Sequence, residues 1–395
     1  MHSLKIKILF ISLFVLITFF LFNEKTAINS MGLIWQKNIT LGNTDIRIYD
    51  KKYRFEGNLF PVAKLPNGFI VLNERGETVF STNLEDENEK YSVSSNYYAL
   101  YEEKPVKNDK LKGRIIRLFN LEGKPINIRK KPPYREKVPK PLNCLISRCS
   151  PRVSPSGEII VLIDSSGMEF SIYSRKLNKI IVQQRSYGPL ITCYGFSKTK
   201  DFFVVGYVNG VVAAFNSEGK ELFNKKIKAG KYNIIKSVFI ADDGGKIGVV
   251  AGLYPENILV LDNKGKLLWH NVTGYNQKHK IFGSFSAGES ERVFVQIPGG
   301  ITIYSNEDGK YINKIRINRF NKKLKLFDAD AGNEGYIVAS FTAKDQTVIK
   351  FITFSGIVLH KIEFPDSFMF VKLSKSGDLL YLQGDKNILC YRIIF

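Results

Sequence analysis

The stretch Val260-Leu-Asp-Asn-Lys-Gly-Lys-Leu-Leu-Trp269 contains the unit from which the fold can be read. An apolar strand is followed by a short polar turn that ends in Gly265, and a second apolar strand comes next. Glycine adopts the positive φ that a tight hairpin needs, and an Asp, Asn or Ser three residues earlier can cap the turn with its side chain. The stretch therefore predicts a β-hairpin.

The same unit recurs along the chain. Its further copies end at Gly76, Gly123, Asn178, Gly219, Gly309 and Gly356. The intervals between successive turn residues range from 41 to 55 residues, and none shows a sustained apolar period of about 3.6 residues. Helical repeats of similar length are therefore disfavoured, and the repeat is one of β-hairpins.

A second hairpin lies upstream of most of these copies. Ser154-Pro-Ser-Gly157, Asp242-Asp-Gly-Gly245 and Ser374-Lys-Ser-Gly377 each join two short apolar runs, such as the run 159–163 that follows the first. Two hairpins in about 45 residues make a four-stranded sheet, which is the blade of a β-propeller. We predict an all-β chain in which residues 31–395 form a single propeller domain.

The two ends of the chain predict how the ring closes. Gly32-Leu-Ile-Trp35 is similar to the outer-strand segment 265–269, and the C-terminus stops after one strand, 388–395. We expect residues 33–41 to complete the last blade and so remove the free edge of the sheet. Seven hairpins and this shared pair predict eight blades; seven is the alternative if a weak copy near residues 45–80 does not form a blade.

The unit at 260–269 resembles the repeat of the pyrroloquinoline-quinone-type, or quinoprotein-like, propellers. The turn 154–157 is similar to those of WD40-like propellers, and the resemblance extends over residues 33–395. It implies the fold strongly and the function weakly, because one fold hosts many functions. Quinoprotein dehydrogenases of this architecture hold a calcium-bound quinone in the central funnel, commonly against a Trp and a disulfide between adjacent cysteines.

The residues that such an enzyme would need are not evident in the sequence. No two cysteines are adjacent, and both Trp residues fall on predicted outer strands. Asp328-Ala-Asp330 is the one acidic pair near a predicted inner strand, and we interpret it as turn capping or a solvated strand end. Metalloprotease, hydrolase and phosphate-binding motifs do not occur. We therefore expect no catalysis, no metal and no cofactor.

Residues 1–30 predict a signal peptide or a signal-anchor transmembrane helix. Lys5 and Lys7 precede the apolar run Ile8–Phe22, which would make a helix of about 22 Å. That length suits a signal peptide. With both lysines reaching back to the membrane surface, the segment could also serve as an anchor. Either role places the propeller outside the cytoplasm, membrane-anchored or secreted.

The four cysteines are divided between two settings. Cys193 and Cys390 lie in apolar runs and are predicted to be inert core residues. Cys144 and Cys149 are close enough in sequence to form a disulfide in an oxidising compartment, and free thiols are the alternative.

The formal net charge of the chain is +21, and one segment is especially basic. Residues 124–152 hold nine Lys or Arg and one acidic residue, and seven prolines lie between positions 125 and 155. This composition predicts an extended, semi-rigid insertion loop between two blades. A second excursion, 102–112, interrupts the middle of the preceding blade.

Strand direction places these excursions on one face of the ring. Because strands alternate in direction within each blade, connections between blades and the middle loops emerge on the same side. The basic connections 224–231 and 316–325 share that face, and the segment 85–89 adds one acidic sector. The charge is either merely solvated or an anion-facing docking surface.

These patterns predict a non-enzymatic scaffold that binds an envelope or membrane protein. An anionic lipid surface or an envelope polymer would also fit the charge, whereas export disfavours nucleic acid. Tyr and Arg are enriched at binding hot spots. The predicted contact residues are Arg129, Lys130, Lys131, Tyr134, Arg135 and Lys137. The alternatives are an accessory factor like the outer-membrane-assembly propeller lipoprotein, a quinone- or calcium-dependent dehydrogenase-like enzyme, and a ligand-sensing ectodomain.

Overall fold

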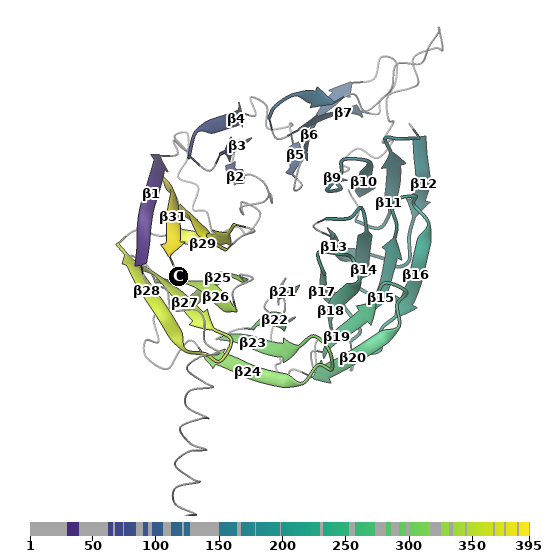
Figure 1. The fold of residues 1–395 in the computed structure, drawn as a ribbon. Helices are drawn as coiled ribbons and strands as arrows, with labels where there is room; N and C mark the ends of the chain where they lie inside the picture. Colours follow the sequence, from purple (N-terminus) through teal and green to yellow (C-terminus); the bar gives the residue numbers. More distant parts are fainter. Residues whose placement is uncertain are drawn as a thin grey trace, which may run out of the picture.

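The computed structural model describes residues 30–38 and, with short gaps, residues 62–126 and 150–394. These ranges contain strands and turns but no helix. The strands form eight antiparallel sheets, seven with four strands and one with three. The sheets stand in a ring, with the first strand of each sheet toward the centre and the last at the circumference (Figure 1). The predicted all-β propeller architecture is confirmed.

Four sheets, given in chain order and from the centre outward, comprise β2 (Val62–Leu65), β3 (Gly68–Leu72) and β4 (Thr78–Asn83); β5 (Lys90–Val93), β6 (Tyr97–Pro105), β7 (Lys112–Asn120) and β8 (Pro125–Ile126); β9 (Ser150–Val153), β10 (Ile159–Ile163), β11 (Phe170–Ser174) and β12 (Lys179–Arg185); and β13 (Ile191–Phe196), β14 (Phe203–Tyr207), β15 (Val211–Phe215) and β16 (Glu221–Lys226). The other four comprise β17 (Ile235–Ile240), β18 (Lys246–Ala251), β19 (Asn257–Asp262) and β20 (Leu267–Val272); β21 (Phe282–Phe285), β22 (Arg292–Ile297), β23 (Gly300–Ser305) and β24 (Tyr311–Arg316); β25 (Lys325–Ala331), β26 (Tyr336–Ala343), β27 (Gln346–Thr353) and β28 (Val358–Phe364); and β29 (Phe368–Leu373), β30 (Leu379–Gly384), β31 (Asn387–Ile394) and β1 (Ser30–Asn38).

The last sheet contains both ends of the described chain. Strand β1 pairs antiparallel with β31 and takes the outer position, in the order β1-β31-β30-β29. The predicted pairing of the N-terminal strand with the C-terminal sheet is confirmed. The strand runs from Ser30 to Asn38, three residues earlier than the predicted segment 33–41.

The turn that leads into the outermost strand of a sheet repeats as predicted. Its glycine has a φ between 70° and 94° at Gly76, Gly123, Gly219, Gly265, Gly309 and Gly356. In the turn at 262–266, one carboxylate oxygen of Asp262 accepts the N–H of Lys264 at 2.9 Å and that of Lys266 at 2.8 Å. Asn73, Asn120 and Asn216 cap their own turns in the same way.

Five of these turns also attach their sheet to the one before it, which the sequence did not reveal. A Cβ atom at Gly265 would lie 2.6 Å from the ring of Phe223 in the preceding outer strand. Trp269 packs against Gly309 in the same manner, and its indole N–H donates to the carbonyl of Asn306 at 3.1 Å. Close approach of the neighbouring sheet is therefore a second reason for glycine at the turn.

Strands take up the ends of the two segments that were predicted to be excursions, 102–112 and 124–152. Strands β6 and β7 pair as far as Pro105 and Lys112, so residues 102–105 and 112 belong to an extended hairpin. Residues 106–111 lie outside the description. Of the segment 124–152, β8 takes residues 125–126 and β9 takes 150–152. The remainder, 127–149, lies outside the described residues.

The apolar core lies between the faces of neighbouring sheets, and two cysteines belong to it. Cys390 is fully buried in β31 and Cys193 packs in β13, and both are free thiols. Burial raises the pKa of Cys193 to about 12, which keeps the thiol protonated. The prediction of inert core cysteines is confirmed.

Of the predicted signal or anchor segment, residues 1–30, all but Ser30 lie outside the described residues, and Ser30 is the first residue of β1. In the part of the chain that is described, no helix is long and apolar enough to span a membrane.

Candidate functional site

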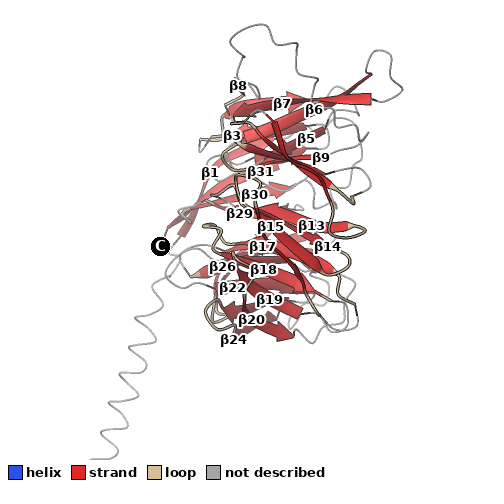
Figure 2. Ribbon diagram, turned by 90° about the vertical axis from the view of Figure 1, so that its right-hand side faces the viewer, coloured by secondary structure: helices blue, strands red, loops and turns tan. Residues whose placement is uncertain are grey.

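The antiparallel order of the strands divides the loops of the ring between two faces. Turns that join the first to the second strand and the third to the fourth lie on one side, which we call the turn face. The loops that join the second to the third strand, and the connections from sheet to sheet, lie on the connector face. Figure 2 shows the ring from the side, with the β6–β7 hairpin extending to the right on the connector face and the C-terminus at the left.

The contact residues predicted from the sequence are not among the described ones. Arg129, Lys130, Lys131, Tyr134, Arg135 and Lys137 fall within 127–149, as do Cys144 and Cys149. This segment connects β8 to β9 and therefore joins strand ends on the connector face. The partner-binding role of the six residues and the disulfide between the two cysteines stay predictions.

A continuous described part of the connector face spans the third, fourth and fifth sheets. It consists of the connection 186–190, the loop 208–210 and the connection 227–234 without residues 230–231. Hydrogen bonds join the loops to one another: Val208 N to Leu190 O at 2.9 Å, Asn209 Nδ2 to Tyr187 O at 3.0 Å, and Ile227 N to Gly210 O at 2.8 Å. These loops therefore hold one another in place.

Three large apolar side chains stand exposed on this framework. Met168 is 48% exposed, Leu190 is 43% exposed and Tyr232 is 45% exposed. The loop that carries Met168 is fastened to the same framework, because Ile191 N donates to Gly167 O at 2.6 Å. Exposed Lys226 and Lys228 flank the group. We call Met168, Leu190 and Tyr232 the connector patch; sequence motifs do not mark it.

Lys226 and Lys228 place positive charge on the surface that carries the connector patch. Its apolar side chains would contribute to binding by burial, and the neighbouring ammonium groups would favour a partner that carries carboxylates. Since the loops are already ordered by hydrogen bonds, little conformational entropy would be lost on binding.

The acidic pair on the inner strand has a different role from the one predicted. Asp328 is buried, and its Oδ2 accepts the N–H of Val371 at 3.2 Å. Asp330 accepts the N–H of Leu373 at 3.0 Å and pairs with Lys372 at 3.1 Å. The carboxylates thus join β25 to β29 of the next sheet, and neither caps a turn nor ends in solvent.

A second inner-strand contact involves a residue counted in the basic insertion. Arg152 lies in β9, and its Nε donates to the hydroxyl of Tyr194 in β13 at 2.7 Å. The guanidinium carbon lies 5.1 Å from the centre of the Tyr194 ring, within cation–π range. Arg152 therefore joins two sheets and does not belong to the proposed docking loop.

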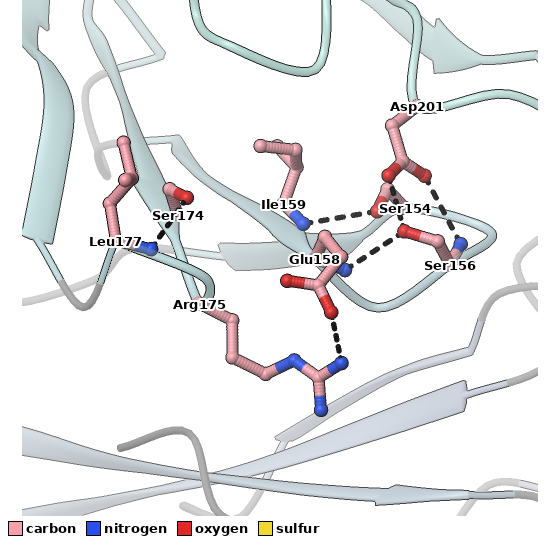
Figure 3. A network of polar contacts seen from close by, with 8 residues as sticks. All are labelled: Ser154, Ser156, Glu158, Ile159, Ser174, Arg175, Leu177 and Asp201. Carbon is pink, nitrogen blue, oxygen red and sulfur yellow. Dashed lines mark hydrogen bonds and ion pairs between the residues drawn. The ribbon is translucent and has the colours of Figure 1, made fainter. Parts of the chain in front are cut away.

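Hydroxyl and carboxyl groups on the turn face form the network in Figure 3. Ser154 Oγ accepts the N–H of Ile159 at 3.1 Å, and the backbone N–H of Ser156 donates to Asp201 Oδ1 at 3.1 Å. The Ser156 hydroxyl donates to the other oxygen of Asp201, which lies in the corresponding turn of the next sheet. The network joins sheets, as the inner-strand carboxylates do. Among the described residues, no three His, Cys, Asp or Glu side chains are grouped so as to hold a metal ion.

Comparison with known proteins supports the fold. A family model described as a beta-propeller protein matches residues 157–394. Similar solved structures include the designed Ika8 protein, with 12% identity, TM-score 0.57 and coverage of 86% of this chain and 94% of that one. BamB from Moraxella catarrhalis has 11% identity and TM-score 0.57, covering 92% and 100%.

The C-terminal WD40 domain of Sif2 has 10% identity and TM-score 0.58, covering 92% of this chain and 99% of that one. Identities this low establish the fold alone. A search of curated proteins gives no match. The predicted resemblance to known propellers is confirmed for the fold, and because the family model matches more than half of the chain, the chain belongs to the β-propeller protein family.

Proposed function

We propose that this chain is a non-enzymatic scaffold that binds a protein partner through its connector face, outside the cytoplasm. The observation that carries the proposal is the connector patch, in which three exposed apolar side chains rest on hydrogen-bonded loops of three sheets. Each of the eight sheets counts as one blade, so the ring has eight blades rather than seven. Residues 1–30 supply the export signal or the anchor.

The polar groups described so far support a structural role. Ser154, Ser156 and Asp201 join sheets on the turn face, and Asp328 and Asp330 join them near the centre. Each of these groups is already engaged by a backbone or side-chain partner, whereas a general acid or base must face a substrate. A scaffold requires no such group.

The partner is a protein segment that presents carboxylates beside apolar side chains. Lys226 and Lys228 flank the connector patch, and the basic residues 129–137 belong to a connection on the same face. Apolar anchors would supply most of the affinity, and the lysines would favour an acidic partner and speed its association. Binding should therefore weaken as salt rises, without being abolished.

The test is affinity capture of the full chain from solubilised membranes, with mass spectrometry of the proteins that co-purify. One variant combines Met168→Ser, Leu190→Ser and Tyr232→Ala, and a second lacks residues 129–141. A matched control combines Leu177→Ser with Ile180→Ser, which are exposed near the turn face. We expect both connector variants to lose a partner that the wild type and the control retain.

Equal capture by all four proteins would overturn the proposal. Co-purification of a quinone or calcium with an otherwise solitary wild-type chain would favour the dehydrogenase-like alternative. Recovery of the outer-membrane assembly machinery would identify the partner as that of an accessory factor.

A further inference from the structure

The outer strands of the last four sheets expose apolar side chains at their turn-face ends. Each strand exposes two, with exposures between 38% and 60%: Leu267 and Leu268 in β20, Tyr311 and Ile312 in β24, Ile357 and Val358 at the start of β28, and Leu33 and Ile34 in β1. We call these eight residues the apolar rim. Single exposed apolar residues are ordinary on a protein surface, but a continuous row marks a site of interaction.

The backbone itself turns three of these side chains outward. In the pairing of β19 with β20, Val260 faces Trp269 and Leu261 faces Leu267, so Leu268 is the extra residue of a β-bulge. Ile312 in β24 and Ile34 in β1 occupy the same bulged position. A bulge redirects a side chain, so that Trp269 packs inward while its neighbour Leu268 stays exposed.

Hydrogen bonds join the neighbouring sheets that carry the rim. The side chain of Asn271 in β20 donates to the carbonyl of Gly309 in the next turn. The side chain of Asn313 in β24 donates to the carbonyl of Phe354 in the turn after that, at 3.2 Å. The outer strands β20, β24 and β28 are thus joined one to the next, and Asp328 and Asp330 join the sheet of β28 to the sheet that contains β1.

The rim ends where the N-terminal segment joins the ring. Ser30 faces Ile394, so β1 begins at the turn-face end of the last sheet. Only residues 23–29 separate Ser30 from the apolar run Ile8–Phe22, and seven residues span at most about 25 Å. Any membrane that receives the run must lie within about that distance of Ser30, at the β1 end of the rim.

We propose that the apolar rim rests on the surface of the membrane that holds the N-terminal segment. The inference depends on the anchored form of the proposed function. Leu, Ile and Tyr side chains would enter the headgroup region, and exposed Lys264 and Lys266 beside them would meet lipid phosphates. The turn face is then directed toward the bilayer, and the connector face points into the aqueous compartment where a partner can reach it.

The test places a tryptophan on the rim of the full chain in vesicles of phosphatidylcholine and phosphatidylglycerol. The variants are Leu268→Trp and Ile312→Trp, and the matched control is Gln183→Trp, an exposed residue nearer the connector-face end of outer strand β12. Since interfacial side chains enter the bilayer by roughly 5–10 Å, lipids brominated at carbons 6 and 7 should quench about half of the added emission of each rim variant. The control should be quenched by less than about a tenth, because its side chain would stay in water.

Flotation of the vesicles and quenching by acrylamide separate the other outcomes. If the chain floats with the vesicles but only acrylamide quenches its rim tryptophans, the rim does not touch the membrane. That result would overturn the rim contact while the N-terminal anchor would still stand. Protection from both quenchers would mean that residues 1–29 or a second copy covers the rim, which also overturns the inference. A chain that does not float overturns the contact together with the anchor, while partner capture in detergent is judged independently.

Discussion

The two faces of the ring are built in different ways. On the turn face one device repeats, since the glycine turns of five sheets pack on the outer strand of the sheet before them. On the connector face the described loops and connections differ in length, for example the three residues 208–210 and the five residues 186–190. The repeated face keeps the ring together, and the variable face is free to carry function. Changes at the contacts between sheets on the turn face should therefore cost stability, and changes at exposed positions of the connector face should cost binding.

The largest loss of stability is expected from Trp269→Ala. The indole is 6% exposed, packs against Gly309 of the next sheet and donates to Asn306 O. Removing a buried aromatic side chain costs about 3–5 kcal/mol through lost burial and the cavity that remains. The midpoint of urea unfolding measures the effect. Leu268→Ala, at the exposed neighbouring position, should cost less than about 1 kcal/mol; equal losses would contradict this account of how sheets are joined.

A somewhat smaller loss is expected from Gly265→Ala. The new methyl group would lie 2.6 Å from the ring of Phe223, at a residue whose φ is 80°. The unfavourable φ and the crowding together should cost about 2–4 kcal/mol. The matched control is Gly32→Ala in β1, where no atom lies within 4 Å of the added methyl group. If thermal denaturation shows the same shift for both variants, contact with the preceding sheet is not what selects glycine.

The regular part of the fold could be predicted because its signals are local. A glycine at positive φ and a capping side chain three residues earlier depend only on their own turn, so Asp262 and Gly265 could be recognised in the sequence. Ring closure followed from the missing outer strand at the C-terminus and the spare strand at the N-terminus. The predicted ends of the strands were less accurate, because residues 102–105 have the composition of a loop yet extend the β6–β7 hairpin.

The functional surface could not be predicted in the same way, because it arises between sheets. Met168 and Leu190 are 22 positions apart and meet through a hydrogen bond between their loops. Asp328 was interpreted from its neighbours in sequence, whereas its partner Val371 lies 43 residues away, one repeat later. Such pairs have no sequence signal beyond the repeat itself. A search for polar residues one repeat apart would have found Ser156 with Asp201, but not Asp328 with Val371, because Val371 donates through its backbone N–H.

A moderate loss is expected from Asp328→Ala, near the centre and between the two faces. The substitution leaves the N–H of Val371 without the carboxylate that now accepts it. An unsatisfied buried donor costs about 1–3 kcal/mol. Asp328→Asn keeps an oxygen acceptor and should lose less than Asp328→Ala in the same urea titration. Equal losses for Asn and Ala would show that the charge, and not the hydrogen bond, joins β25 to β29.

The smallest change in stability, with the largest change in function, is expected from Leu190→Ser. Leu190 is 43% exposed, and its backbone carbonyl would still accept the N–H of Val208, so the loop keeps its position. The free energy of unfolding should change by less than about 1 kcal/mol, as for substitutions at most exposed sites. Leu177 is 53% exposed on the turn face, and Leu177→Ser should change the free energy of unfolding by as little. Capture of the partner separates them, because only the connector-face variant should lose it. If both variants lose the partner, or neither does, the two faces do not divide stability from binding in the way their construction implies.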